Sequence, residues 1–308
     1  MTESSTIAVS AEAGPTHADA AARSLGSDAW RSLKKNPIFW VSVFLIVLFV
    51  LMSAWPSLFT HIDPNNAVLA DARATPSSKA WFGRDIQGYD IYSRTIYGAR
   101  ASILVGVFTT IVTTLIGGAM GTVAGYYGGW LDSVVSRVTD VFFAIPLLLG
   151  GILFMATFPN NADSPYLVVV GKVVLVLSIF GWTSIARLMR SAVLQVKPND
   201  YVQAARALGA SPWRIIRAHV LPNAVAPVIV VATINLGVFI SVEATLSFLG
   251  IGLTPPAVSW GVAISDALDA LRTTPHILLF PSLFLSLAVL AFIMLGDAVR
   301  DAFDPKSR

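Results

Sequence analysis

The sequence predicts an all-α integral membrane protein with six transmembrane helices. Of its 308 residues, 55% are hydrophobic and only 13% are charged, and the mean hydropathy is +0.70. A soluble domain has about a quarter of its residues charged, so this composition excludes an ordinary soluble protein. Six apolar runs also come near the length of about 20 residues that crosses the hydrocarbon core of a bilayer.

The composition also excludes several kinds of chemistry. The chain has no cysteine, which rules out disulfide bonds and zinc–thiolate sites, and its four histidines lack the spacing of a zinc site. The formal net charge of +3 is too small to indicate nucleic-acid binding. No Gly-x-Ser-x-Gly elbow, metalloprotease motif or phosphate-binding loop occurs, so we predict no catalytic residue, no metal site and no bound cofactor.

The N-terminal tail, residues 1–36, is rich in Ala, Ser, Thr and acidic residues and has no apolar period, so we expect it to be disordered. The first transmembrane helix is expected within residues 37–57, over the apolar run 38–54. A cleaved signal peptide is the competing interpretation. The run is longer than the usual signal core and lies far from the terminus, which disfavours a signal peptide.

Residues 101–300 are expected to form the core domain, with five further transmembrane helices, and residues 301–308 a C-terminal tail. The predicted spans are approximately 102–126, 134–158, 167–188, 224–249 and 277–299. Glycines recur every fourth residue in the first of these, at Gly117, Gly121 and Gly125. They clear one helix face of side chains, which predicts close packing of another helix; a role in substrate passage is the alternative.

The orientation follows from the basic residues in the short loops. Lys and Arg concentrate in the N-terminal tail, in residues 187–217 and at the C-terminus, whereas the loop 159–166 has none. Because basic loops stay in the cytoplasm, both termini and the loop 189–222 are expected to be cytoplasmic. Residues 58–100 are then an extracytoplasmic loop that ends in an interfacial helix. In that helix Asp85, Asp90, Arg94 and Arg100 are spaced to pair along one face.

Ionisable residues inside the predicted spans are few. Arg137 and Asp140 near the start of the third span are spaced to pair with each other, and a proton relay is the alternative interpretation. Glu243 in the fifth span is costly in a bilayer unless its carboxyl is paired, protonated or facing water. It is predicted either to contact the transport pathway or to make a buried structural hydrogen bond.

The longest charged segment between apolar spans, residues 200–223, is predicted to form two short helices. Asp200 and Gln203 are spaced as a capping box, and Gly209 provides a left-handed stop. Ser211 and Pro212 then favour the start of a second helix, which the Leu221-Pro222 pair is expected to end. The segment is basic, so one alternative is a loop that lies on the anionic cytoplasmic leaflet.

This segment resembles the coupling loop, often called the EAA loop, of the membrane subunits of type I ATP-binding-cassette importers. Its matching residues are Gln203, Ala204, Ala205, Gly209, Leu221 and Pro222. Gln203 replaces the usual acid. The sequence His-Val-Leu-Pro-Asn from His219 is typical of the dipeptide and oligopeptide branch, also called the peptide/nickel branch. Three more runs resemble that branch in the same order: 81–106, 243–261 and 296–305.

The resemblance implies a MetI-like permease fold and a bacterial plasma-membrane subunit of an importer for dipeptides or oligopeptides. Nickel chelates and glutathione are alternative cargoes. It also implies the partners: a second, homologous permease subunit, two cytoplasmic ATPases that use the ATP, and an extracytoplasmic binding protein. The residues expected to dock the ATPase are those of the coupling-loop motif together with Arg206 and Arg214. Glu243 and Ser247 are expected to border the pathway. A proton-coupled carrier is a less favoured alternative. It would require acids near the membrane midplane and an internal repeat, and the sequence shows neither clearly.

Overall fold

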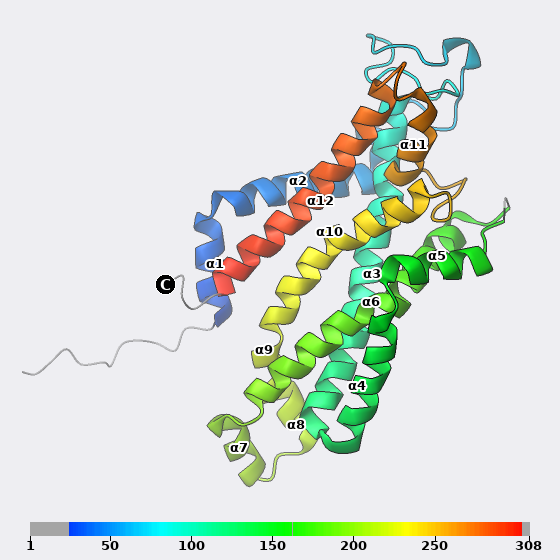
Figure 1. Ribbon diagram of the computed structural model, residues 1–308. Coiled ribbons are helices and arrows are strands. Elements are labelled where there is room, and N and C mark those ends of the chain that lie inside the picture. The colour runs from blue at the N-terminus through cyan, green and yellow to red at the C-terminus, as the bar shows by residue number, and fades with distance from the viewer. Residues whose placement is uncertain (1–24, 162, 304–308) are drawn as a thin grey trace, which may run out of the picture.

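The computed structural model describes residues 25–161 and 163–303, and the described chain is built from helices (Figure 1). No β-strand occurs among these residues, where the one isolated bridge joins Arg84 to Asp90. Five helices are long and apolar enough to cross a membrane. They are α2 (Pro37–Ala54), α3 (Ile91–Tyr127), α6 (Tyr166–Val196), α10 (Ala226–Phe248) and α12 (His276–Phe303). The predicted all-α membrane fold is therefore confirmed.

The third predicted span is not one straight helix. It consists of α4 (Gly129–Ala144) and α5 (Leu147–Thr157), which are bent by 78° relative to each other. The break lies at Ile145, whose extended backbone precedes Pro146. A proline disfavours the helical conformation of the residue before it and itself has no N–H group to donate. A sixth crossing exists only if this bent pair counts as one span.

The remaining elements of the described chain are short. They are α1 (Leu25–Lys35), η1 (Pro56–Leu58), η2 (Leu69–Asp71), α7 (Asp200–Ala207), α8 (Pro212–Ile215), the π-helical turn η3 (Ile216–Val220), α9 (Leu221–Ala224), α11 (Trp260–Asp266) and η4 (Leu268–Ala270). The helix α1 corrects the expectation of disorder throughout residues 1–36. The rest of that tail, residues 1–24, lies outside the described residues, as do residues 304–308 of the C-terminal tail.

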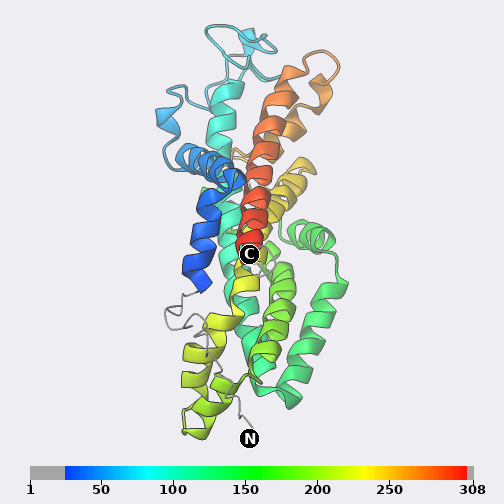
Figure 2. The same ribbon diagram turned by 90° about the vertical axis from the view of Figure 1, so that its left-hand side faces the viewer.

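The long helix α3 runs through the molecule and organises the other helices. Its main neighbour is α6, while α10, α12 and α2 pack on its other sides (Figures 1 and 2). The described residues form four buried apolar clusters, of which one lies between α3, α5, α6 and α10 and another between α2, α3, α10 and α12. We call the end that carries α7, α8 and α9 the coupling end, and the end that carries residues 56–90 and α11 the distal end. Figure 2 shows the two at opposite poles of the molecule.

Candidate functional site

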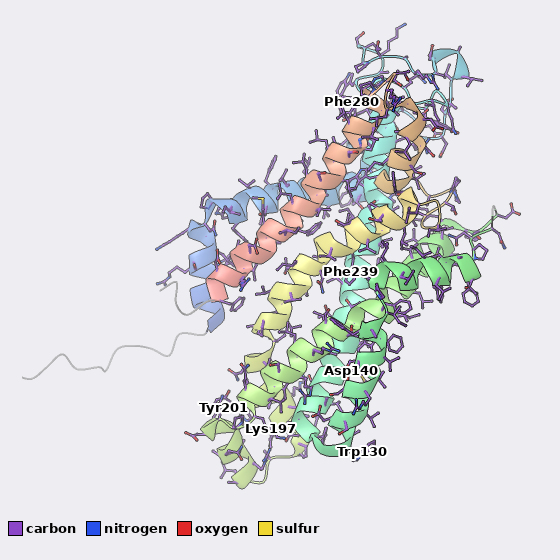
Figure 3. All side chains as sticks on the ribbon, viewed as in Figure 1. Trp130, Asp140, Lys197, Tyr201, Phe239 and Phe280 are labelled. Atoms are coloured by element: carbon purple, nitrogen blue, oxygen red, sulfur yellow. The ribbon has the colours of Figure 1, made fainter. Side chains whose placement is uncertain are left out.

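The segment with the coupling-loop pattern forms a bent helical hairpin at the coupling end, near Lys197 and Tyr201 in Figure 3. The first helix, α7, starts at Asp200, and Asn199 rather than Asp200 is its N-cap. The predicted capping box is therefore wrong. The Gln203 Nε2 donates instead to the Lys197 carbonyl oxygen, at 3.0 Å. Gln203 thus fastens the start of the hairpin to the end of α6.

The turn between the two short helices matches the sequence prediction. Gly209 has a φ of +80°, the left-handed conformation in which side chains are disfavoured. The Gly209 N–H donates to the Arg206 carbonyl oxygen at 3.0 Å, and the Ala210 N–H donates to the Ala205 carbonyl oxygen at 3.1 Å. This pair of bonds is a Schellman motif. Ser211 then caps α8, because its hydroxyl oxygen accepts from the Arg214 N–H at 3.4 Å.

The predicted end of the second helix at Leu221-Pro222 is wrong. The chain stays helical through these residues, by way of the π-turn η3 and then α9. The Leu221 N–H donates to the Ile216 carbonyl oxygen, five residues back. A proline in a regular helix would clash with the carbonyl group four residues before it, and the wider π-turn ahead of Pro222 avoids that geometry. The segment is therefore linked almost without interruption to α10.

The hairpin has an apolar inner face and an exposed outer face. Val202, Ile215 and Val220 are buried against the ends of α3 and α6. Seven of the eight residues predicted to dock a partner are exposed on the outer face: Gln203, Ala204, Arg206, Gly209, Arg214, Leu221 and Pro222. The eighth, Ala205, is half-buried and packs against the inner cluster. Leu208 and Trp213 lie among them with 88% and 69% of their surfaces exposed. Sequence reasoning missed these two, although large apolar residues in a basic loop were a usable signal.

The glycine face of α3 lies directly against α6. A Cβ atom at Gly117 would be 2.5 Å from the Trp182 carbonyl oxygen, and one at Gly125 would be 2.9 Å from the Val193 Cβ. A Cβ at Gly121 would collide with the Ala186 carbonyl oxygen. Because contacts this short do not occur between real atoms, α3 and α6 approach each other closely only while these positions lack side chains. We call these three residues the glycine seam.

Two ion pairs join α4 to α6 near the coupling end. The Arg187 Nη2 lies 2.8 Å from the Asp140 Oδ1, and the Arg190 Nη2 lies 2.7 Å from the Asp132 Oδ2. The expected pair within α4, between Arg137 and Asp140, is not formed. The bend at Pro146 lays α4 along α6, so that arginines of the neighbouring helix reach both carboxylates.

Glu243 is fully buried and joins three parts of the chain. The Ser102 Oγ of α3 donates to its Oε2 and the Ser247 Oγ of α10 donates to its Oε1, each at 2.8 Å. The Ser247 Oγ in turn accepts from the Leu253 N–H at 3.0 Å, in the turn after α10. Of the two predictions for Glu243, the buried structural hydrogen bond is confirmed. A contact between Glu243 and the transport pathway stays a prediction. Ser102, which lies far away in the sequence, was not predicted.

At the distal end, the interfacial helix starts later than expected. Asp90 is the N-cap of α3 and accepts from the Ser93 N–H at 2.8 Å, so Asp85 lies in the preceding loop and not on a helical face. The Arg94 guanidinium lies 3.2 Å from Asp85 and 4.0 Å from Asp266 of α11. Burial raises the pKa of the Asp266 carboxyl, Arg94 opposes that rise, and Asp85 adds to it. Arg94 therefore ties the outer loop to α11.

Comparison with known proteins adds the family. A family model described as "Binding-protein-dependent transport system inner membrane component" matches residues 114–308. A second model, "N-terminal TM domain of oligopeptide transport permease C", matches residues 24–76.

No group of three or more His, Cys, Asp or Glu side chains suited to a metal ion occurs in residues 25–161 or 163–303.

Curated relatives extend over nearly the whole chain. The oligopeptide transport system permease protein OppC of Bacillus subtilis (strain 168) is 37% identical, over 92% of this chain and 91% of its own length. The dipeptide transport system permease protein DppC of the same organism is 40% identical, over 91% and 86%. The glutathione transport system permease protein GsiD of Pectobacterium atrosepticum is 35% identical, over 95% of each chain.

Solved structures support the fold. A chain of the inward-facing MetNI methionine ABC transporter aligns with a TM-score of 0.54 and 21% identity, over 68% of this chain and 96% of that one. An amino acid ABC transporter aligns with a TM-score of 0.51 and 17% identity, over 66% and 91%. The predicted MetI-like fold is thereby confirmed. The first family model covers more than half of the sequence, and the curated relatives cover nearly all of it. This chain therefore belongs to the binding-protein-dependent transport system inner membrane components, which are the permeases of ATP-binding-cassette importers, on the branch that includes the oligopeptide and dipeptide permeases.

Proposed function

We propose that this chain is one permease subunit of an ATP-driven importer that takes up dipeptides or oligopeptides across the bacterial inner membrane. It forms half of the translocation pathway, and a second, homologous permease subunit forms the other half as a heterodimer. Two cytoplasmic ATPases bind and hydrolyse the ATP, and an extracytoplasmic binding protein delivers the cargo. The names of the oligopeptide and dipeptide relatives support this cargo.

The exposed outer face of the coupling hairpin carries the proposal. Ala204 and Ala205 allow close seating in a cleft of the ATPase, and Gly209 fixes the bend of the hairpin. Trp213 is an aromatic anchor of the kind that dominates protein interfaces, and Leu208 adds exposed apolar surface beside it. The exposed guanidinium groups of Arg206 and Arg214 pair with acidic residues of the partner, which steers association and sets the register.

The inner face of the hairpin transmits the movement. Ile215 and Val220 are packed against Val193 and its neighbours on α6, so the hairpin and α6 move as one body when the ATPases close. The continuous path through α9 extends the same movement to α10. At the far end of α10, Glu243 and Ser247 hold the turn that follows, and in this way they act on the gate between the two permeases. The mechanism is alternating access between two packed states.

The coupling end and both termini lie in the cytoplasm, and the distal end lies on the extracytoplasmic side of the membrane. The basic side chains support this arrangement, because Arg206, Arg214 and Arg217 are exposed at the coupling end. A glutathione permease among the relatives supports glutathione as a second cargo, and nickel chelates remain the other alternative.

Uptake into proteoliposomes tests the proposal. The complete importer, with both permeases, the ATPases and the binding protein, is reconstituted and supplied with a labelled dipeptide. We expect uptake that requires ATP on the side of the ATPases and binding protein on the other side. Uptake driven by a pH gradient without ATP would instead identify a proton-coupled carrier. Competition by unlabelled dipeptide, glutathione and a nickel chelate then ranks the three cargo classes.

A further inference from the structure

A pocket lined by both polar and apolar groups opens at the distal end, away from the coupling hairpin and the glycine seam. It is open to solvent and has a volume of about 370 Å³, within the range of roughly 300–1,000 Å³ that is typical of small-molecule sites. Four separate parts of the chain form it: the loop after η1, α3, the start of α6 and the turn after α10. The side chains that matter here are those of Asp63, Tyr97, Arg100, Tyr166, Pro256 and Val258.

Arg100 is held in place and still has donor capacity. Its Nε donates to the Ser53 carbonyl oxygen at 2.9 Å, and its Nη2 donates to the Ala54 carbonyl oxygen at 3.3 Å, at the end of α2. The Nη1 group has no acceptor among the residues that the structure describes. A guanidinium fixed in this way is suited to bind a carboxylate, because its orientation is already set before the ligand arrives.

Tyr166, the first residue of α6, supplies a second donor. Its hydroxyl is buried and has no hydrogen-bond partner in the described part of the chain. A buried polar group without a partner costs free energy, so a rotation of the tyrosine side chain that brings its hydroxyl to an acceptor atom of a ligand in the pocket is favoured. Tyr166 and Arg100 line the same pocket, so one ligand can contact both side chains.

The opposite charge is present in the same pocket. Asp63 and His61 lie on the loop that faces α3, and the Asp63 Oδ1 accepts from the Asn65 N–H at 2.9 Å. Within residues 25–161 and 163–303, Asp63 forms no ion pair with Arg100. A pocket with an unpaired cation and an unpaired anion is complementary to a zwitterion, and Pro256 and Val258 add an apolar wall.

We propose that this pocket binds the carboxyl-terminal end of the transported peptide. The terminal carboxylate accepts hydrogen bonds from Arg100 and Tyr166, and the last side chain packs against Pro256 and Val258. In a dipeptide or tripeptide the amino-terminal ammonium group pairs with Asp63. The inference rests on the proposed peptide uptake and deepens it, because it places selection for a free carboxylate in the permease as well as in the binding protein.

Direct binding to the permease tests the pocket. The complex of both permeases and the ATPases, in lipid nanodiscs without the binding protein, is titrated with tri-alanine and with tri-alanine amide. We expect tri-alanine to bind at least about tenfold more tightly, because hydrogen bonds to a charged group are lost in the amide. Tyr166→Phe removes only the hydroxyl and should narrow that ratio to about threefold or less. Arg100→Lys, which keeps the charge but not the fork of donors, should narrow it as well.

Tyr127→Phe is the matched control, since Tyr127 is 53% exposed at the other end of α3 and should leave the ratio unchanged. Equal binding of the two peptides by an importer whose ATP-driven uptake is intact would overturn the pocket proposal. An unchanged ratio of the two affinities in Tyr166→Phe would overturn it as well. Absence of ATP-driven peptide uptake by the wild type would instead refute the proposed function.

Discussion

Glycines in two regions of this chain have opposite surroundings. In the seam of α3, a Cβ atom at Gly121 would collide with the backbone of α6, although α3 is an ordinary right-handed helix at that point. In the coupling hairpin, a Cβ at Gly209 would meet nothing within 4 Å, but the backbone there is left-handed, with a φ of +80°. The seam therefore excludes any side chain because of the neighbouring helix, and the hairpin disfavours one because of its own backbone.

The difference indicates how each region works. The seam fixes a distance between two helices, so any added volume there is transmitted to α6 and to the ion pairs that α6 makes with α4. The hairpin fixes a direction of the chain while its surface stays open for a partner. Substitutions in the seam should consequently affect the stability of the subunit, whereas substitutions in the hairpin should affect coupling. Four variants follow in order of decreasing effect on stability: Gly121→Val and Gly209→Asp test this separation directly, and two variants outside both regions provide a scale for the effects.

Gly121→Val should have the largest effect. The branched side chain has no space against Ala186 and Met189, and overpacking of this kind costs about 1–3 kcal/mol or more. We expect a lower melting temperature of the detergent-solubilised protein and little protein in the membrane. Gly118→Ala on the same helix is the control, because a Cβ there meets nothing within 4 Å. A wild-type melting temperature for Gly121→Val would show that the seam does not limit packing.

Glu243→Ala should come next, because it removes the acceptor of two buried serine hydroxyls, those of Ser102 and Ser247. A buried donor left without a partner costs about 1–3 kcal/mol, and a serine hydroxyl in a helix can turn to the carbonyl oxygen of the preceding turn, so we expect a loss at the lower end of this range for each serine. Unfolding in a denaturing detergent measures the loss. Glu243→Gln keeps one carbonyl oxygen as acceptor and should lose about half as much. If Ala and Gln destabilised equally, the hydrogen bonds to the serines would not be the stabilising feature.

Gly209→Asp should abolish uptake and leave the protein folded and inserted. The left-handed backbone costs a non-glycine residue about 1–2 kcal/mol, a modest loss of stability. The side chain fills the surface where the partner seats, and its negative charge opposes the acidic residues expected there. Gly209→Asn has the same size without the charge and tolerates the left-handed conformation, so it should retain part of the uptake. Normal transport by the Asp variant would refute the docking role.

Asp132→Asn should have the smallest effect. Its partner Arg190 has 37% of its side chain exposed, and ion pairs open to solvent contribute about 1 kcal/mol or less. A double-mutant cycle with Arg190→Gln, measured by thermal unfolding, isolates the pair. A coupling energy well above about 1 kcal/mol would show that the contact between α4 and α6 is a stronger constraint than the seam comparison predicts.

Much of the fold was predictable, because a bilayer restricts the chain to long apolar helices. The positions of α2, α6, α10 and α12 follow from hydropathy alone. The Gly209 turn followed from local backbone chemistry, and so did the Ser211 cap. Two of the errors occurred where two local signals competed. Pro146 broke a span that hydropathy joined, while Pro222 was accommodated within a helix that its presence was expected to end.

The sequence by itself determined the membrane class, the apolar spans, the left-handed turn and the pattern shared with importer permeases, because each depends on neighbouring residues. Only the tertiary structure decided which distant groups meet: Ser102 with Glu243, Arg187 with Asp140, and Arg100 with the end of α2. It also decided that Leu208 and Trp213 stay exposed while Val202 and Ile215 are buried. The physical reason is that hydropathy describes only the tendency of each residue to leave water. Which apolar side chains are buried depends on how the helices pack, and above all on the packing of α3 against α6.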